Sequence, residues 1–145
     1  MRPRQAVALL ALAGIFVALY LTLYKFGVLG ELSCSVGDCE TVNTSRWAVF
    51  LGLPVAAWGL GAYVVLFAIA LAGQGERYED SRRVAIALAA ISGGGVLFSG
   101  WLTYLELFVI HAICIWCVTS AVIVTLVFIA SLLDLRASGR EAVAE

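Results

Sequence analysis

The sequence predicts an all-α membrane protein, a bundle of four transmembrane helices that forms one domain over residues 1–145. Two observations predict this class. Hydrophobic residues make up 63% of the chain and charged residues 13%, and the mean hydropathy of +1.02 is too high for a soluble domain of this length. The charged residues also lie between four uncharged runs, each close to the roughly 20 residues that cross a bilayer.

The four expected spans cover residues 6–24, 53–72, 84–105 and 112–133. Arg2 and Arg4 precede the first span, as they would precede a secretory signal peptide, but the apolar run exceeds the roughly 7 to 15 residues of a signal sequence. We therefore expect a retained span. The second span is entered through Pro54, which a first helical turn tolerates. The third contains Gly93-Gly94-Gly95 and Gly100, small residues that let a neighbouring helix or a flat ligand approach closely, and helix packing is favoured.

The positive charges predict the orientation in the membrane. Only Lys25 and Arg46 fall on one side of the expected spans; the other seven fall on the opposite side, at Arg2, Arg4, Arg77, Arg82, Arg83, Arg136 and Arg140. Because Lys and Arg are enriched in cytoplasmic loops, both termini and the middle loop are expected to be cytoplasmic. The loop of residues 25–52 and the turn of residues 106–111 are then extracytoplasmic.

Four cysteines form two pairs on the extracytoplasmic side. Cys34 and Cys39 lie in the long polar loop, and Cys114 and Cys117 form a C-x-x-C at the outer start of the fourth span. A helix N-terminus presents unsatisfied N–H groups and a partial positive charge, so Cys114 is predicted to be the more nucleophilic thiol of its pair. Cys117, one turn deeper, faces the apolar side. Two such pairs can pass electrons by thiol-disulfide exchange.

Three other interpretations of the cysteines are weighed against a relay. Two structural disulfides are common outside the cell, but a C-x-x-C closes too short a loop to stabilise a fold much. A zinc site of four thiolates fits the spacing but not an oxidising membrane face, so no metal is expected. Packing as small hydrophobic side chains does not explain two cysteines in a polar loop.

One ordered set of residues runs through nearly the whole chain: Cys34, Cys39, Ser45-Arg46-Trp47, Pro54, Gly59, Tyr63 and Cys114-Ile115-Trp116-Cys117. In order, spacing and topology this set resembles the vitamin K epoxide reductase (VKOR) family, in particular its stand-alone bacterial members. The resemblance implies four helices around a quinone pocket in the bacterial inner membrane. It also implies that the outer loop carries a short cap helix, here over residues 40–50.

The resemblance further implies a quinone-dependent thiol oxidase that drives disulfide-bond formation. Members oxidise a thioredoxin-fold, DsbA-like partner and pass two electrons to a membrane quinone, either ubiquinone or menaquinone. By resemblance, the partner's thiolate attacks Cys34, Cys39 shuttles to Cys114, and Cys117 delivers electrons to the quinone. Because the chain stops about a dozen residues after the fourth span, no fused thioredoxin domain is expected and the partner should be a separate protein.

Further candidate site residues come from the resemblance and from local chemistry. Ser45 matches the family's loop serine, although an equally good interpretation is a helix N-cap. His111 could assist thiolate formation or quinone protonation, or it could anchor the chain at the interface, and the anchoring role is favoured. The expected quinone-binding residues are Cys117, Trp58, Gly59, Trp116 and His111. Glu106, the only acid between the third and fourth spans, could take up protons or mark the water boundary, and the second role is favoured.

Two positions bear on the substrate. Animal members of the family place an asparagine near the start of the second span and a tyrosine shortly after the C-x-x-C, whereas this chain has Val55 and Ala121 there. These differences argue against epoxide reduction and leave quinone reduction. An unrelated four-helix disulfide oxidase carries its C-x-x-C in the first outer loop, the reverse of the order seen here.

The alternative from a different class is a non-catalytic membrane protein stabilised by disulfides, either an assembly subunit or a small transporter. Charged residues within the spans would favour transport. The four expected spans contain none.

Overall fold

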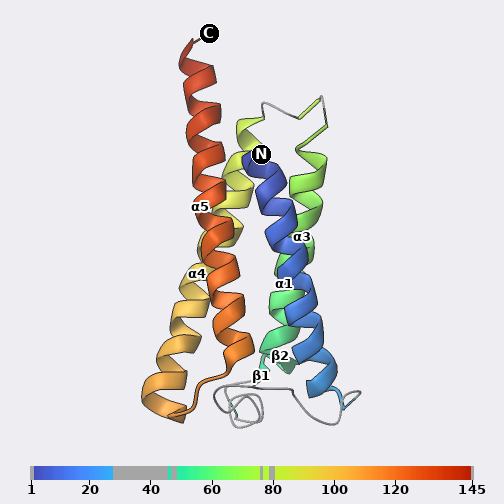
Figure 1. Cartoon of the computed structure of the whole chain (residues 1–145), viewed down its shortest axis with the longest axis vertical. Coiled ribbons are helices and arrows are strands. Elements are labelled where there is room, and N and C mark those ends of the chain that lie inside the picture. Colours follow the sequence, from blue (N-terminus) through green and yellow to red (C-terminus); the bar gives the residue numbers. More distant parts are fainter. Residues whose placement is uncertain (1, 28–45, 47–48, 76, 79–80, 145) are drawn as a thin grey trace.

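Four long helices make up almost all of the chain (Figure 1). They are α1 (Pro3–Lys25), α3 (Val55–Ala72), α4 (Arg82–Leu105) and α5 (Ile115–Ala144). The computed structural model describes residues 2–27, 46, 49–75, 77–78 and 81–144, with side chains given up to residue 138. Each helix contains a stretch long and apolar enough to cross a membrane. The predicted class, an all-α membrane bundle of four spans, is confirmed.

The helices run alternately up and down (Figure 1). Helix α1 packs against α3 and α5, and α5 packs in turn against α4, whereas α3 and α4 share a smaller contact. In the apolar stretch of α1, 39% of the residues are buried, against 17–22% in the other three helices, so α1 is the helix most enclosed by the bundle. Both termini and the α3–α4 connection lie at one end of the molecule, which we call the termini end.

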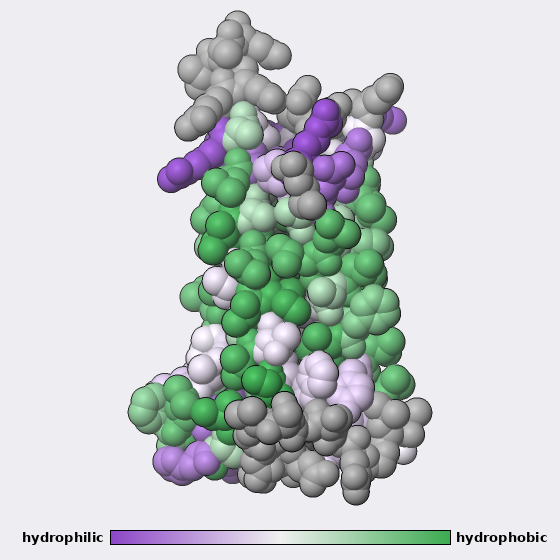
Figure 2. Space-filling model, viewed as in Figure 1, coloured by the Kyte–Doolittle hydropathy of each residue, from purple (hydrophilic) through white to green (hydrophobic). Residues whose placement is uncertain are grey.

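The outer surface of the bundle matches a lipid environment. Large apolar side chains point outward on every helix; Phe16 is 63% exposed and Leu97 is 78% exposed. Figure 2 shows these side chains as a hydrophobic band around the middle of the molecule, with hydrophilic residues gathered at the termini end. Exposure of this apolar band to water would cost free energy, and contact with lipid tails removes that cost.

Small residues let the helices approach closely inside the bundle. A Cβ atom on Gly14 of α1 would overlap the ring of Tyr63 on α3. On α4, a Cβ on Gly95 would lie 2.8 Å from Cγ2 of Val124, and one on Gly93 would lie 3.1 Å from Cε2 of Phe128. Gly93 and Gly95 therefore serve helix packing against α5, the favoured role for the small residues of this span, whereas a Cβ on Gly94 or Gly100 would meet open space.

A buried polar cluster joins α1 and α5 with the adjoining ends of α3 and α4 at the termini end. The Arg4 guanidinium donates to the Asp134 carboxylate at 2.9 Å, and Arg4 itself is only 4% exposed. The same guanidinium donates to the backbone carbonyls of Gly73, Tyr78 and Ser81 at 2.6–2.8 Å. Helices α1 and α5 extend beyond the expected spans, and Arg4 and Asp134 lie in these extensions. The prediction that the spans contain no charged residues therefore holds only for the shorter predicted ranges.

The turn between the last two spans differs from the prediction. Helix α4 continues without interruption into a π-helical segment, η2 (Glu106–Ile110), which ends at His111 in the left-handed conformation with φ 57°. The fourth helix begins at Ile115 rather than at residue 112 and continues to Ala144 rather than to 133. Glu106 is 4% exposed. The expectation that this acid marks the water boundary was wrong, because the helix carries it inside the bundle.

A short hairpin precedes α3 at the opposite end. Strand β1 (Val49–Phe50) pairs antiparallel with β2 (Leu53–Pro54), and the turn residues Leu51 and Gly52 both have positive φ, as a two-residue type I′ turn requires. Pro54 is consequently the N-cap of α3, in extended conformation, and not part of its first turn. The hairpin also makes residues 49–50 extended, where the cap helix was expected; most of that predicted helix lies outside the described residues.

Candidate functional site

Cys114 is the N-cap residue of α5. Its carbonyl accepts the first helical bond from the Val118 N–H at 3.0 Å, and its Sγ accepts a bond from the Cys117 N–H at 3.4 Å. The sulfur thus occupies the place that a serine or threonine hydroxyl takes in an ordinary N-cap. At this position the helix dipole and an otherwise unsatisfied N–H both stabilise a negatively charged sulfur.

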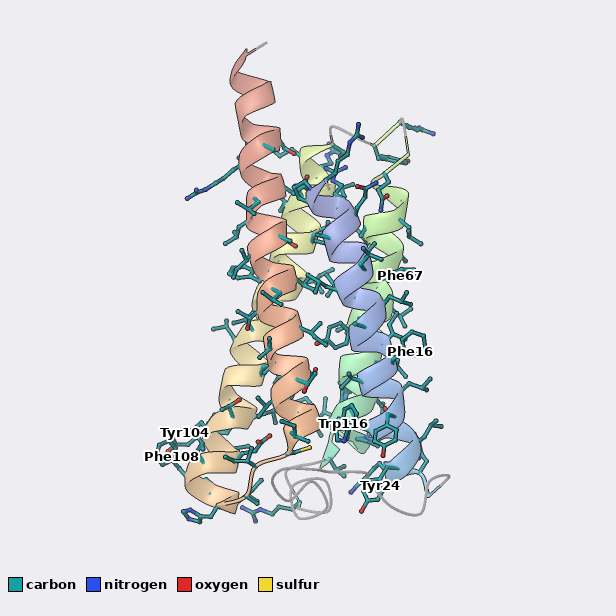
Figure 3. All side chains as sticks on the ribbon, in the orientation of Figure 1. Phe16, Tyr24, Phe67, Tyr104, Phe108 and Trp116 are labelled. Atoms are coloured by element: carbon teal, nitrogen blue, oxygen red, sulfur yellow. The ribbon has the colours of Figure 1, made fainter. Side chains whose placement is uncertain are left out.

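The two cysteines of the C-x-x-C have different surroundings. Cys114 is 0% exposed and packs in a small apolar cluster with Leu21. The indole of Trp116 lies beside it and contacts the ring of Tyr20, with 5.0 Å between ring centroids. Figure 3 shows Trp116 directed from the start of α5 toward α1. Another thiol can therefore reach Cys114 only when this packing opens, whereas Cys117 is only half-buried.

A cavity lies directly beside Cys117, between all four helices. Its volume is about 120 Å³, well above the roughly 10–15 Å³ that one water molecule needs on the same measure, so a small flat ring can enter. Most of its wall is apolar, and the residues that form it are Ala18, Leu21, Lys25, Pro54, Val55, Ala56, Gly59, Phe98, Ser99, Leu102, Thr103, Leu105, Glu106, Ile110, Cys117, Ser120 and Ala121. An apolar cavity with a few polar groups is the usual form of a small-molecule site.

The two positions that are expected to bear on substrate choice both belong to this wall. Val55 enters the cavity from the first turn of α3, and Ala121 enters it from α5, one turn beyond Cys117. Both positions therefore carry an aliphatic side chain, whereas animal members of the family that the sequence resembles have a hydrogen-bonding side chain at each.

Glu106 connects the cavity with both cysteines. Its Oε2 accepts a hydrogen bond from the Cys114 N–H at 3.3 Å, and its carboxyl group also shares a hydrogen bond with the Cys117 side chain. From the sequence, proton uptake was one of two roles for Glu106, but its contacts with the cysteines were not predicted. A usable signal was present, because Glu106 is the only acid from residue 84 to residue 133 and lies eight residues before Cys114.

Of the other predicted site residues, some line the cavity and others lie outside its wall. Gly59 lines the cavity with Cys117, as expected for quinone binding. Trp58 instead donates its indole N–H to the Phe50 carbonyl at 2.9 Å and secures the hairpin. His111 is exposed at the end of η2, and Trp116 packs on Tyr20; neither belongs to the cavity wall.

Three predicted catalytic residues, Cys34, Cys39 and Ser45, lie outside the described residues. Within the part of the chain that the structure describes, no group of three or more His, Cys, Asp or Glu side chains could hold a metal ion.

Fold and site together define a membrane-embedded oxidoreductase, with a cysteine pair at a helix start and a ring-sized apolar cavity beside its second sulfur. The sequence model of the Vitamin K epoxide reductase family matches residues 5–132 of the chain, and the chain belongs to this family. Its general chemistry is therefore membrane disulfide and quinone redox chemistry. The resemblance noted in the sequence is confirmed.

Proposed function

We propose that this protein is a quinone-dependent thiol oxidase that reoxidises a separate thioredoxin-fold, DsbA-like partner and passes the electrons to a membrane quinone. The observation that carries the proposal is the position of Cys117, whose side chain belongs to the wall of an apolar cavity while Cys114 caps the same helix. Family membership favours this oxidoreductase over the non-catalytic, disulfide-stabilised membrane protein.

The cavity suits a quinone ring. Its aliphatic wall matches a flat apolar ring, and Lys25, Ser99 and Glu106 supply polar groups within that wall. A bound quinone would accept two electrons and two protons to become a quinol. Ubiquinone and menaquinone both meet these requirements, and the aliphatic Val55 and Ala121 support quinone rather than epoxide as the substrate.

The proposed electron path uses both cysteine pairs. The partner's thiolate attacks the Cys34–Cys39 disulfide at Cys34, and resolution of that mixed disulfide leaves the partner oxidised and the loop pair reduced. Cys39 then attacks Cys114, which breaks the Cys114–Cys117 disulfide, and the released Cys117 sulfur takes up a proton equivalent to the one that Cys39 gave up. Attack of Cys34 on Cys39 re-forms the loop disulfide and frees Cys114. The C-x-x-C dithiol finally closes again as its two electrons leave for the quinone.

The proposed sidedness follows the charges. Arg2, Arg77, Arg82 and Arg83 belong to the termini end, and this excess supports a cytoplasmic location for that end. The C-x-x-C, the hairpin and the cavity would then lie near the extracytoplasmic face, where the partner works.

Turnover by the purified protein tests the proposal. Full-length protein in detergent should reduce a soluble short-chain quinone when a reduced thioredoxin-fold protein supplies the electrons. Cys114→Ala and Cys117→Ser should each abolish turnover, whereas Leu97→Ala, a change on the lipid-facing surface, should leave it intact. Turnover that persists in either cysteine variant would contradict the electron path.

A further inference from the structure

We propose that Glu106 is a catalytic acid-base residue, which takes the proton of the Cys117 thiol and hands it to an oxygen of the quinone in the cavity. This inference rests on the proposed function and adds the proton path to its electron path. Three features of Glu106 carry it: its burial, its contacts with both cysteines, and its place in the cavity wall.

The reaction creates a need for such a group. Closing the C-x-x-C forms one S–S bond and releases two electrons and two protons, while reduction of a quinone consumes two of each. The Cys117 sulfur lies in a mostly apolar cavity wall, where few groups can accept its proton. The carboxyl group that shares a hydrogen bond with this thiol and also lines the cavity can accept the proton on one side and release it on the other.

The reaction balances when one of the two protons passes through Glu106. The Cys117 proton moves to the carboxylate as the S–S bond forms, and the same proton then moves to the quinone oxygen, so Glu106 returns to its starting form. The second proton of the quinol comes from solvent. Solvent receives an equivalent proton from Cys114, whose thiolate is stabilised at the helix N-terminus.

The hydroxyl groups of Thr103 and Ser120, which also belong to the cavity wall, are less suited to this task. The Thr103 hydroxyl donates to the Ser99 carbonyl at 2.8 Å, and the Ser120 hydroxyl shares a hydrogen bond with the Tyr63 hydroxyl at 2.9 Å. Glu106 is the only carboxylic acid among the described residues of the wall. One carboxyl oxygen of Glu106 can accept the Cys114 N–H while the other oxygen accepts and releases a proton.

A structural role is the competing explanation, because the bond from the Cys114 N–H also holds the turn between η2 and α5. Glu106→Gln separates the two roles. The amide oxygen can still accept the Cys114 N–H, but the amide cannot carry a proton. Asp134→Asn is the matched control, since it converts another buried carboxylate to an amide at the opposite end of the bundle. It should lower the stability, because Arg4 loses its counter-charge, but it should not change the rate per folded molecule.

The kinetic test uses full-length protein in detergent with the C-x-x-C reduced beforehand and then mixed with excess soluble quinone. The rate of quinone reduction per folded molecule should fall about a hundredfold in Glu106→Gln, the size typical for loss of an acid-base group, and stay near wild type in Asp134→Asn. Added formate should restore part of the rate in Glu106→Ala. An unchanged rate in a folded Glu106→Gln variant would overturn the inference, whereas a wild-type protein that reduces no quinone would overturn the proposed function instead.

A second readout needs neither quinone nor turnover. In the reduced protein, the infrared S–H stretching band of Cys117, assigned by its loss in Cys117→Ser, should lie at the lower frequency of a hydrogen-bonded thiol. It should move to higher frequency in Glu106→Ala and keep its place in Asp134→Asn. A band that Glu106→Ala leaves in place shows that the thiol does not donate to Glu106, and the inference fails even if the variant is poorly active.

Discussion

The guanidinium of Arg4 and the carboxylate of Asp134 form a buried ion pair of 2.9 Å across 130 positions of sequence. The pair joins the first and last helices, and three backbone carbonyls of the α3–α4 region complete the coordination of the guanidinium. All four spans are thereby connected at the termini end, far from the cavity.

Removing Arg4 should be strongly destabilising. Arg4→Met leaves the Asp134 charge buried without its partner, and such a loss costs about 3–5 kcal/mol. Thermal unfolding in detergent should show a clearly lower midpoint, while Arg136→Met, at an exposed position, should change it little. The double variant Arg4→Met/Asp134→Leu should recover part of the loss, and a single variant as stable as wild type would show that the pair contributes nothing.

Gly14→Ala should destabilise the contact between α1 and α3. The new Cβ would overlap the Tyr63 ring, and moving the ring would disturb the bond of its hydroxyl to Ser120. Overpacking of this kind costs about 1–3 kcal/mol. The matched control is Gly61→Ala on α3, where a Cβ meets open space and should be neutral or stabilising by up to about 1 kcal/mol. Equal unfolding midpoints for the two variants would contradict the close contact.

Filling the cavity should block quinone but not folding. Ala121→Phe places a ring in the cavity wall, so the KM for a soluble quinone should rise at least about tenfold, the equivalent of roughly 1.4 kcal/mol. The neighbouring Val122→Phe adds similar bulk at a position that is 53% exposed toward lipid, and its KM should stay at the wild-type value. Steady-state kinetics with a chemical dithiol as electron donor measures both, and identical KM values would place the quinone elsewhere.

The N-cap role of Cys114 should be separable from its redox role. Cys114→Ser and Cys114→Ala should both lose turnover, but serine keeps an acceptor for the Cys117 N–H whereas alanine removes it. Loss of an N-cap costs about 0.5–2 kcal/mol, so the serine variant should unfold at the higher temperature. Alanine and serine variants of equal stability would mean that the sulfur does not stabilise the helix start.

Local chemistry made much of the fold and part of the site predictable. Uncharged runs identified all four spans because lipid demands apolar side chains over a fixed length. The C-x-x-C spacing placed Cys114 at a helix start, where the structure has it. These features depend on residues close together in sequence, so the sequence alone carries them.

The parts that were missed depend on packing between distant residues. In the sequence, Arg4 and Asp134 each mark the end of an apolar run. Their burial is possible because the two opposite charges pair in the folded chain, which the sequence alone does not reveal. Glu106 also looks like a boundary residue, and only the π-helical turn brings it to Cys114 and Cys117. The hairpin before α3 depends on Leu51 at positive φ, a conformation that a leucine rarely adopts.

The π-helical turn also limits which changes in chain length this segment can accept. A π-helix closes each backbone bond over one residue more than an α-helix does, so η2 behaves as a built-in insertion between α4 and His111. Deleting one residue after Glu106 would convert the turn to regular helix and rotate the start of α5 by about 100° relative to α4. Substitutions in this segment should therefore be tolerated better than any insertion or deletion.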